Sequence, residues 1–260
     1  MLTRRLIVCL DVQGGRVVKG TRFVDLRDVG DPADLAWHYE REGADEITFL
    51  DISASHEERD TLLSVARRTA ERLFVPLTLG GGIRTADDVG RALRAGADKV
   101  SINSAAVERP AVIAEAAERF GAQCVVASID AKREGGTWRV HTHGGRRPTP
   151  LEAVAWAREC ARLGAGEILL TSMDRDGVRS GYDLELTRAV AAAVDVPVIA
   201  SGGCGEPRHV SEVLSATDAD AALVAGILHD GRTTVAALKG AMIADGIPTR
   251  RTIPLAGANP

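Results

Sequence analysis

The sequence has few aromatic residues, few cysteines and no long hydrophobic run, and each shortage excludes a class of protein. Aromatic residues make up 3% of the 260 positions, so the core must be built from aliphatic side chains. No window approaches the roughly 20 uninterrupted apolar residues that a membrane span needs. The four cysteines are scattered, without the spacing of a metal site or a disulfide framework. We expect a cytoplasmic protein with reduced thiols.

An excess of basic charge is also missing. The chain has 32 Lys and Arg against 36 Asp and Glu, which gives a formal net charge of −4 at pH 7. We therefore expect a mixed surface rather than a basic face for nucleic acid, and neither nucleic acid nor a membrane as the partner.

What the chain does contain is an alternation of short β-branched runs with longer amphipathic stretches. Helix starts are marked by Asp31-Pro32, by Thr85 with Asp88, and by Thr149-Pro150 with Glu152. Eight such units of similar length predict an α/β protein with a closed (β/α)8 TIM barrel. The expected strands are 6–10, 47–50, 76–79, 100–102, 125–129, 168–171, 198–200 and 221–224.

An internal repeat divides the expected barrel into two halves. The segment at 43–47, GADEI, returns as GAGEI at 164–168, and VPLTLGGG at 75–82 returns as VPVIASGG at 196–203, both 121 positions later. We therefore predict a single domain over residues 1–260, built from half-barrels at about 1–120 and 121–250.

Two aspartates end symmetry-related strands, Asp11 after the first and Asp130 after the fifth. A lone Asp in such a position is usually a turn former. In a barrel of this kind, however, the carboxyl ends of the strands form the active face. Two carboxylates across one mouth can act as general base and general acid, so we predict that Asp11 and Asp130 are the catalytic pair.

Glycine clusters predict two phosphate sites. Glycine allows backbone N–H groups to approach an anion closely, although tight turns also need glycine for their geometry alone. Each half offers one cluster, at Gly81-Gly82 with Asn103-Ser104, and at Gly202-Gly203 with Ala225-Gly226. Two such sites predict a ligand with a phosphate at each end.

Taken together, these residues and motifs resemble a known family, the cyclase subunit of imidazole glycerol phosphate synthase from histidine biosynthesis. The resemblance runs in order from about Leu6 to about His229, and its most specific segments are VVKG at 17–20 and DRDG at 174–177. Other matching segments are CLDV at 9–12, FLDI at 49–52, GGGI at 80–83, DKVSIN at 98–103 and IDAKR at 129–133.

The resemblance implies a reaction, a partner and no cofactor. The family takes ammonia from a glutaminase subunit, with which it forms a heterodimer. It converts a bisphosphorylated formimino-ribulosyl aminoimidazole carboxamide nucleotide into imidazole glycerol phosphate and aminoimidazole carboxamide ribonucleotide. Applied to this chain, Asp11 would be the base towards the attacking nitrogen and Asp130 the acid, although the symmetry of the barrel does not decide between this and the reverse.

The resemblance also implies roles for further residues. The supporting polar residues of the substrate site fall on Lys19, Asp51, Asn103 and Asp176 with Gly177, and Asp98 falls on a contact with the glutaminase. Lys19 lies in a long segment without an obvious helix, which is typical of a lid. A charged ring where ammonia enters falls on Arg5, Glu46, Lys99 and Glu167. The alternative for that ring is a set of solvated strand ends.

Some features depart from the family or suggest other readings. Gly226 stands where the family commonly has Ser, and Pro150 where it commonly has Gly, and the segment 217–220 carries one extra residue. His141 and His143 suit a metal, but no third ligand is placed, so we predict no metal.

Two other functions stay open, namely the related bisphosphate-sugar isomerase of the same pathway and a catalytically inactive subunit that activates a glutaminase. A nicotinamide or flavin cofactor is not expected, because no G-x-G-x-x-G motif follows a strand.

Overall fold

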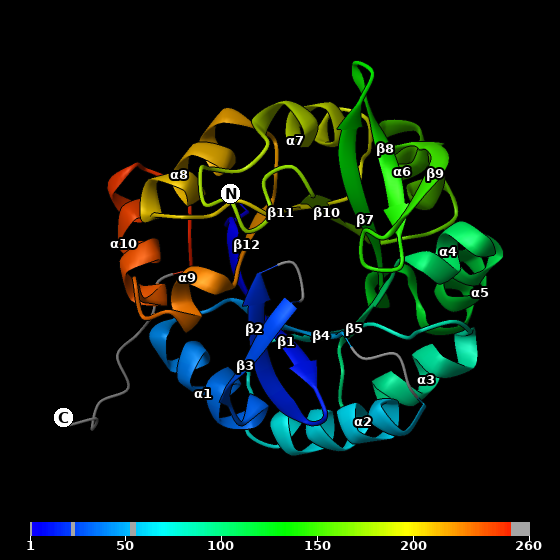
Figure 1. Cartoon of the computed structure of the whole chain (residues 1–260), viewed down its shortest axis with the longest axis horizontal. Coiled ribbons are helices and arrows are strands. Elements are labelled where there is room, and N and C mark those ends of the chain that lie inside the picture. Colours follow the sequence, from blue (N-terminus) through cyan, green and yellow to red (C-terminus); the bar gives the residue numbers. More distant parts are fainter. Residues whose placement is uncertain (1, 22–23, 53–55, 251–260) are drawn as a thin grey trace.

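Parallel pairing of eight strands closes the centre of the molecule into a barrel, as the computed structural model in Figure 1 shows. The structure describes residues 2–21, 24–52 and 56–250. The barrel strands are β1 (Arg5–Gln13), β4 (Glu46–Asp51), β5 (Leu77–Gly80), β6 (Lys99–Ile102), β7 (Val125–Glu134), β10 (Glu167–Ser172), β11 (Val198–Ser201) and β12 (Ala221–Val224). Because β12 pairs with β1, the barrel has no open edge, and the predicted fold class is confirmed.

Helices surround the barrel (Figure 1). They are α1 (Pro32–Glu42), α2 (His56–Ala70), α3 (Ala86–Arg94), α4 (Ser104–Glu108), α5 (Ala111–Phe120), α6 (Ala153–Arg162), α7 (Leu184–Ala191), α8 (Pro207–Ala216), α9 (Gly226–His229) and α10 (Val235–Ala244). Within the described ranges, none of them is both long enough and apolar enough to span a lipid bilayer.

The predicted helix starts are confirmed at two positions and wrong at a third. The Asp31 side chain accepts hydrogen bonds from the backbone N–H groups of Ala33 and Asp34, and Thr85 forms a capping box with Asp88. The segment Thr149-Pro150, however, lies in strand β9 (Arg147–Glu152), and α6 begins after Glu152, whose own carboxylate caps it. Glutamate is not among the usual capping residues, so the sequence pattern favoured the nearby threonine.

Two β-hairpins extend from the barrel at the carboxyl ends of its strands, which we call the upper end. The segment after β1, expected as a long loop, forms β2 (Arg16–Thr21) and β3 (Val24–Gly30) instead. The segment after β7 forms β8 (Thr137–Thr142) and β9, which confirms the predicted hairpin arm at 137–142. The turns from β1 into β2 and from β7 into β8 each consist of a Gly-Gly pair with positive φ, at 14–15 and at 135–136. This is the conformation that a tight hairpin turn requires of its central residues.

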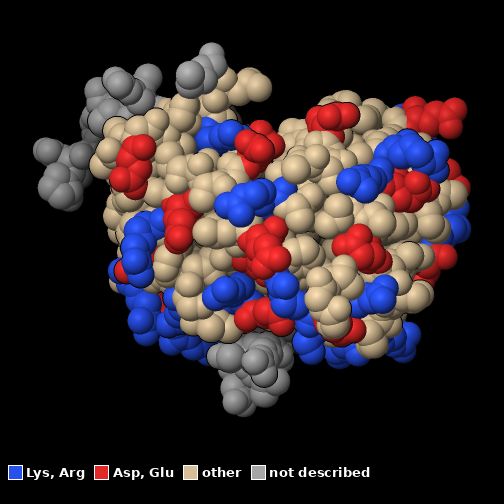
Figure 2. All heavy atoms as spheres, turned by 90° about the horizontal axis from the view of Figure 1, so that it is seen from above, with Lys and Arg blue, Asp and Glu red and all other residues tan. Residues whose placement is uncertain are grey.

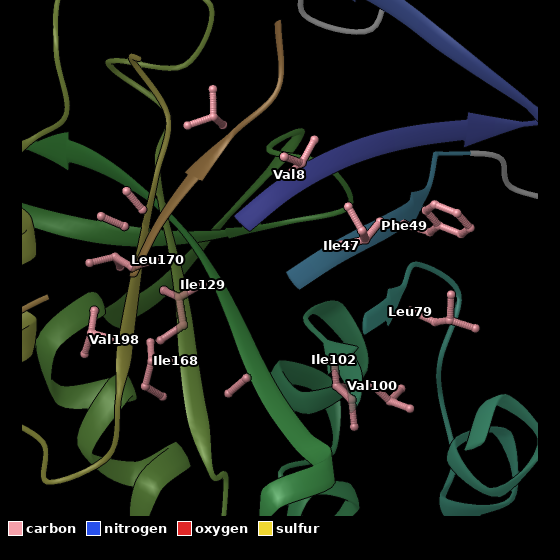
Figure 3. Close-up of a cluster of buried hydrophobic side chains, with 14 of the residues drawn as sticks. Val8, Ile47, Phe49, Leu79, Val100, Ile102, Ile129, Ile168, Leu170 and Val198 are labelled. Atoms are coloured by element: carbon pink, nitrogen blue, oxygen red, sulfur yellow. The ribbon is translucent and has the colours of Figure 1, made fainter. Parts of the chain in front are cut away.

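Alternating side chains give the barrel two separate apolar regions. Figure 3 shows the larger one, which lies between the strands and the surrounding helices and includes Val8, Ile47, Phe49, Ile129 and Leu170. The smaller region is formed by side chains of alternate register on the same strands. Its buried members are Ile7, Cys9, Val126, Leu169, Ile199, Ala221 and Leu223. The register that places these residues inside also places Asp11 and Asp130 at the mouth of the barrel.

Candidate active site

Three carboxylates share the upper mouth of the barrel. Asp11 lies in β1 opposite Leu50 of β4, and Asp130 lies in β7 opposite Thr171 of β10. Asp176 follows β10, and its negative charge raises the pKa of both other carboxyls. The carboxyl ends of β1, β7 and β10 therefore bring three acidic side chains within electrostatic range of one another.

Burial gives the two predicted catalytic carboxyls pKa values close to neutrality. It raises the pKa of Asp11 from 3.8 to about 7, with a further contribution from Asp176. Burial also raises the pKa of Asp130, to about 6, but there a hydrogen bond from Asn103 favours the ionised form and opposes the rise. Two carboxyls that titrate near neutral pH can exchange protons with a substrate, which ordinary surface aspartates cannot.

Asn103 connects this pair to the first predicted phosphate cluster. Its Nδ2 donates a hydrogen bond of 2.9 Å to Oδ2 of Asp130. Although Asn103 precedes α4, its side chain does not cap that helix. Its Oδ1 atom is buried and has no hydrogen-bond partner among the described residues. A buried acceptor without a partner is uncommon in native proteins, and in a cleft it offers a position for a ligand donor.

The first glycine cluster packs tightly against the end of β4. Gly81 and Gly82 have positive φ angles of 91° and 67°, and a Cβ atom on Gly81 would lie 2.2 Å from the carbonyl oxygen of Asp51. A larger residue would therefore displace the loop. Ser104 begins α4, and its Oγ accepts a hydrogen bond from the backbone N–H of His143, so its own hydroxyl proton remains for another acceptor.

The second glycine cluster is joined by Lys19. Gly202 and Gly203 again have positive φ angles, of 90° and 106°, and Ala225-Gly226 leads into α9. Nζ of Lys19 donates to the carbonyl oxygen of Gly226 over 2.8 Å. The structure thus brings Lys19, which lies in β2, to the second cluster, although the two are far apart in the sequence. Gly177 also has a positive φ, of 75°, directly after Asp176.

At the opposite end of the barrel, the four charged residues form a closed ring. Nη1 of Arg5 lies 2.6 Å from Glu46 and 2.7 Å from Glu167, and Nζ of Lys99 lies 3.1 Å and 3.0 Å from the same two carboxylates. Each cation contacts both anions. Because the ring has two positive and two negative members, it is electrically neutral. It differs from a set of separate solvated strand ends, because its members bridge four different strands.

Asp98, predicted as a partner contact, has a structural role in this fold. Its carboxylate accepts a hydrogen bond of 2.8 Å from the backbone N–H of Leu77 at the start of β5. Asp45 and Asp220 do the same for Leu6 and Val198. This shared role was not predicted, although the recurrence of Ala-Asp before strands signals it.

The two histidines that suggested a metal are engaged elsewhere. His141 is buried in β8, with Nδ1 near the carbonyl oxygen of Gly145 and Nε2 3.2 Å from Glu134. His143 lies in the turn before β9 and contacts Glu108 at 3.7 Å. In the part of the chain that is described, no three acidic, histidine or cysteine side chains are grouped as metal ligands.

Asp230, which follows α9, is a further charged residue of the site that the sequence does not predict. Its carboxylate is paired with Lys19 at 2.5 Å and with arginines from two other segments. Nothing in the sequence around Asp230 signals this, because all of its partners except Arg232 lie far away along the chain.

The molecular surface agrees with the charge balance of the sequence. Figure 2 shows one face, on which basic and acidic side chains lie interspersed. This face does not present the continuous basic area that nucleic-acid binding requires.

Comparisons with known proteins complete the description of the site. Residues 5–234 match the family described as "Histidine biosynthesis protein". The chain is 72% identical over 250 residues to the imidazole glycerol phosphate synthase subunit HisF of Myxococcus xanthus (strain DK1622), covering 96% of this chain and 99% of that relative. It is 58% identical over 253 residues to the protein of the same name from Lysinibacillus sphaericus (strain C3-41), covering 96% and 100%.

Proposed function

Since this chain belongs to the histidine biosynthesis protein family, we propose that its barrel carries the cyclase activity of imidazole glycerol phosphate synthase. The chain uses ammonia to convert the bisphosphorylated formimino-ribulosyl aminoimidazole carboxamide nucleotide into imidazole glycerol phosphate and aminoimidazole carboxamide ribonucleotide. It is a lyase of histidine biosynthesis. The observation that carries the proposal is the pair Asp11 and Asp130, two carboxyls with near-neutral pKa values at one barrel mouth.

The electrostatics favour Asp130 as the base and Asp11 as the acid. Asn103 donates a hydrogen bond to Asp130, which stabilises the carboxylate and keeps its pKa at about 6. Burial and the charge of Asp176 raise the pKa of Asp11, and no hydrogen bond to its ionised form opposes this rise. A base must be ionised and an acid protonated before the reaction, so this order is the reverse of the working assignment made from the sequence.

The two glycine clusters would bind the two phosphates of this substrate. Gly81, Gly82, Asn103 and Ser104 would hold one phosphate, and Gly202, Gly203, Ala225 and Gly226 the other. Backbone N–H groups at glycines with positive φ support this assignment, because they can form anion-binding concavities. Lys19, Asp51, Asp176 and Gly177 would contact the substrate between and beside the two clusters.

Ammonia would enter at the opposite face. The names of both relatives describe a subunit, which supports a complex. We propose a glutaminase as the partner, docked on the lower face around Asp98, in a heterodimer that works in the cytoplasm. The ring of Arg5, Glu46, Lys99 and Glu167 would then be the gate, since its paired charges can be covered by a partner without leaving a charge uncompensated.

The paired hairpins support the proposed division of the single domain into half-barrels. Each hairpin follows the strand that carries one of the two aspartates, and each is joined to that strand by a Gly-Gly turn at equivalent positions, 121 residues apart. Residues 251–260 of the predicted domain lie outside the described residues.

The decisive experiment is turnover of the bisphosphate substrate by the purified chain with an ammonium salt and no partner. We expect both products to form, and we expect the variant Asp130→Asn to form neither at a comparable rate. An inactive glutaminase activator would give no product, and the sister isomerase would act on its own bisphosphate without ammonia. Failure of the wild-type chain to consume the substrate would overturn the proposal.

A further inference from the structure

One carboxylate at the mouth of the barrel forms ion pairs with four basic side chains. Asp230 is paired with Nζ of Lys19 at 2.5 Å, with Arg27 at 2.7 Å, with Arg179 at 2.5 Å and with Arg232 at 3.8 Å. These cations come from β2, from β3, from the loop between β10 and α7, and from the segment after α9. Figure 1 shows β2 and β3 on the same side of the barrel as α9.

The charges in this cluster do not balance. Four cations face one carboxylate, and the ion pairs among the described residues give Lys19, Arg27 and Arg179 no second acidic partner. Hydrogen bonding and charge from Lys19, with Arg179, lower the pKa of Asp230, so it is ionised at neutral pH. The cluster therefore retains an excess of positive charge that a further anion can neutralise.

Two of these four residues, Lys19 and Arg179, lie at the second predicted phosphate cluster. Lys19 donates to the Gly226 carbonyl, and its Nζ lies 3.6 Å from where a Cβ of Gly226 would be. The loop that carries Arg179 packs directly on the other half of the cluster. A Cβ on Gly205 would lie 2.1 Å from the Arg179 carbonyl oxygen, and Gly181 donates a backbone hydrogen bond to the carbonyl of Gly203.

The backbone of Arg179 is itself unusual. Its φ is 62°, and only one other non-glycine residue in the described ranges, His143, has a positive φ. A side-chain-bearing residue adopts this conformation when its surroundings impose it, and such residues concentrate at ligand sites. The guanidinium of Arg179 is held by its ion pair with Asp230.

We propose that Asp230 is an internal competitor for the substrate's phosphoryl group. Its carboxylate binds Lys19, Arg27 and Arg179, and a phosphomonoester arriving at the second glycine cluster takes these three cations over. This inference rests on the proposed function for the identity of the substrate, and it adds two arginines and a regulating carboxylate to the site.

A phosphate is able to win this competition. At neutral pH a phosphomonoester carries a charge between about −1.5 and −2, against −1 for the carboxylate, and it offers three acceptor oxygens. Arginine binds phosphate through two parallel N–H groups, so Arg27 and Arg179 each gain a bidentate partner. The carboxylate makes release easier in return, because it is already in place to recover the cations when a product leaves.

The test is phosphate affinity in the variant Asp230→Asn, measured by calorimetric titration with inorganic phosphate at constant pH and ionic strength. Asparagine keeps the size and an acceptor oxygen but removes the charge. We expect phosphate to bind about three- to tenfold more tightly than to the wild-type chain, the effect of removing one nearby negative charge. The KM for the bisphosphate substrate should also be lower in this variant than in the wild-type chain.

Two further variants make the result specific. Asp28→Asn removes one negative charge from the same hairpin, where Asp28 is paired with Arg16 on the surface, and should leave phosphate affinity unchanged. Arg179→Gln should weaken phosphate binding by a similar factor. In the double variant with Asp230→Asn, the increase in phosphate affinity should be smaller than in Asp230→Asn alone.

Equal or weaker phosphate binding by Asp230→Asn would overturn the inference, because the carboxylate would then organise the cations rather than compete for them. The titration with inorganic phosphate needs no turnover. Failure of this inference is therefore distinguishable from failure of the proposed function, which is judged by product formation with ammonium salt.

Discussion

Asp11→Asn should stabilise the protein while it inactivates the enzyme. The pKa of Asp11 rises from 3.8 to about 7 on folding, so the native state resists ionisation of this carboxyl. At roughly 1.4 kcal/mol per pKa unit, the ionised form costs the native state about 4 kcal/mol. Asparagine has nearly the same size and no charge, so it removes this cost.

The pH dependence of that stabilisation follows from its sign. Below the unfolded pKa of about 4, the carboxyl is protonated in both states, and the two proteins should have equal stability. Between about pH 4 and 7 only the unfolded state ionises, so the wild-type chain loses stability progressively relative to Asp11→Asn. The difference should reach about half of its final value near pH 5.5 and its full value of about 4 kcal/mol above pH 7.

Urea unfolding at pH 5.5 and pH 8.5 measures this difference. The midpoint for Asp11→Asn should exceed that of the wild-type chain at both values, and by more at pH 8.5. The control Asp28→Asn changes an exposed carboxylate and should give no such gain. A variant that is no more stable than the wild-type chain, or a difference independent of pH, would refute the view that Asp11 is held in a desolvated site.

Four other substitutions test separate parts of the site. Asp130→Asn should reduce turnover at least about 100-fold with little change in KM, as expected for loss of a positioned acid-base group; near-normal turnover would remove Asp130 from the mechanism. Asn103→Ala should raise the pKa of Asp130 and shift the acidic limb of the pH–rate profile to higher pH, and an unmoved limb would contradict the proposed role of its amide. Lys99→Ala opens the charged ring and should make the partner consume more glutamine per product, whereas turnover with ammonium salt should survive; unchanged stoichiometry would mean that the ring is no gate. Gly226→Ser restores the hydroxyl that is common in the family and, with 3.6 Å to Lys19, should fit and tighten phosphate binding about threefold, unless that site does not bind phosphate at all.

The sequence was sufficient for the barrel because the barrel depends on local patterns. Short β-branched runs, capping residues such as Asp31 and glycines before strands all act within a few residues, and each repeats around the fold. The β2–β3 hairpin was missed for a different reason. The Gly14-Gly15 turn that leads from β1 into β2 resembles a loop signal, and only its match to Gly135-Gly136 in the other half indicates a hairpin.

The aspartates were predictable from position, whereas their electrostatics were not. A strand end is visible in the sequence, but the burial that brings the pKa of Asp11 to about 7 depends on side chains from several strands. Asp230 lay beyond reach for the same reason, since Lys19 and Arg179 are 211 and 51 positions away from it in the chain. Contacts of this kind depend on the closed barrel and have no local signature.

The way each hairpin leaves the barrel gives the two aspartates unequal mechanical freedom. Asp130 is held on both edges of its strand, by Thr171 of the barrel on one side and by His141 of the hairpin on the other. Asp11 is paired with Leu50 on one edge, and the register of β1 with β2 begins only one residue later, at Val12. The backbone of Asp130 is therefore coupled to the β8–β9 hairpin and to the barrel at once, whereas the backbone of Asp11 is coupled directly to the barrel alone. The two carboxylates occupy equivalent strand ends of the repeat but differ in how firmly a hairpin is joined to them.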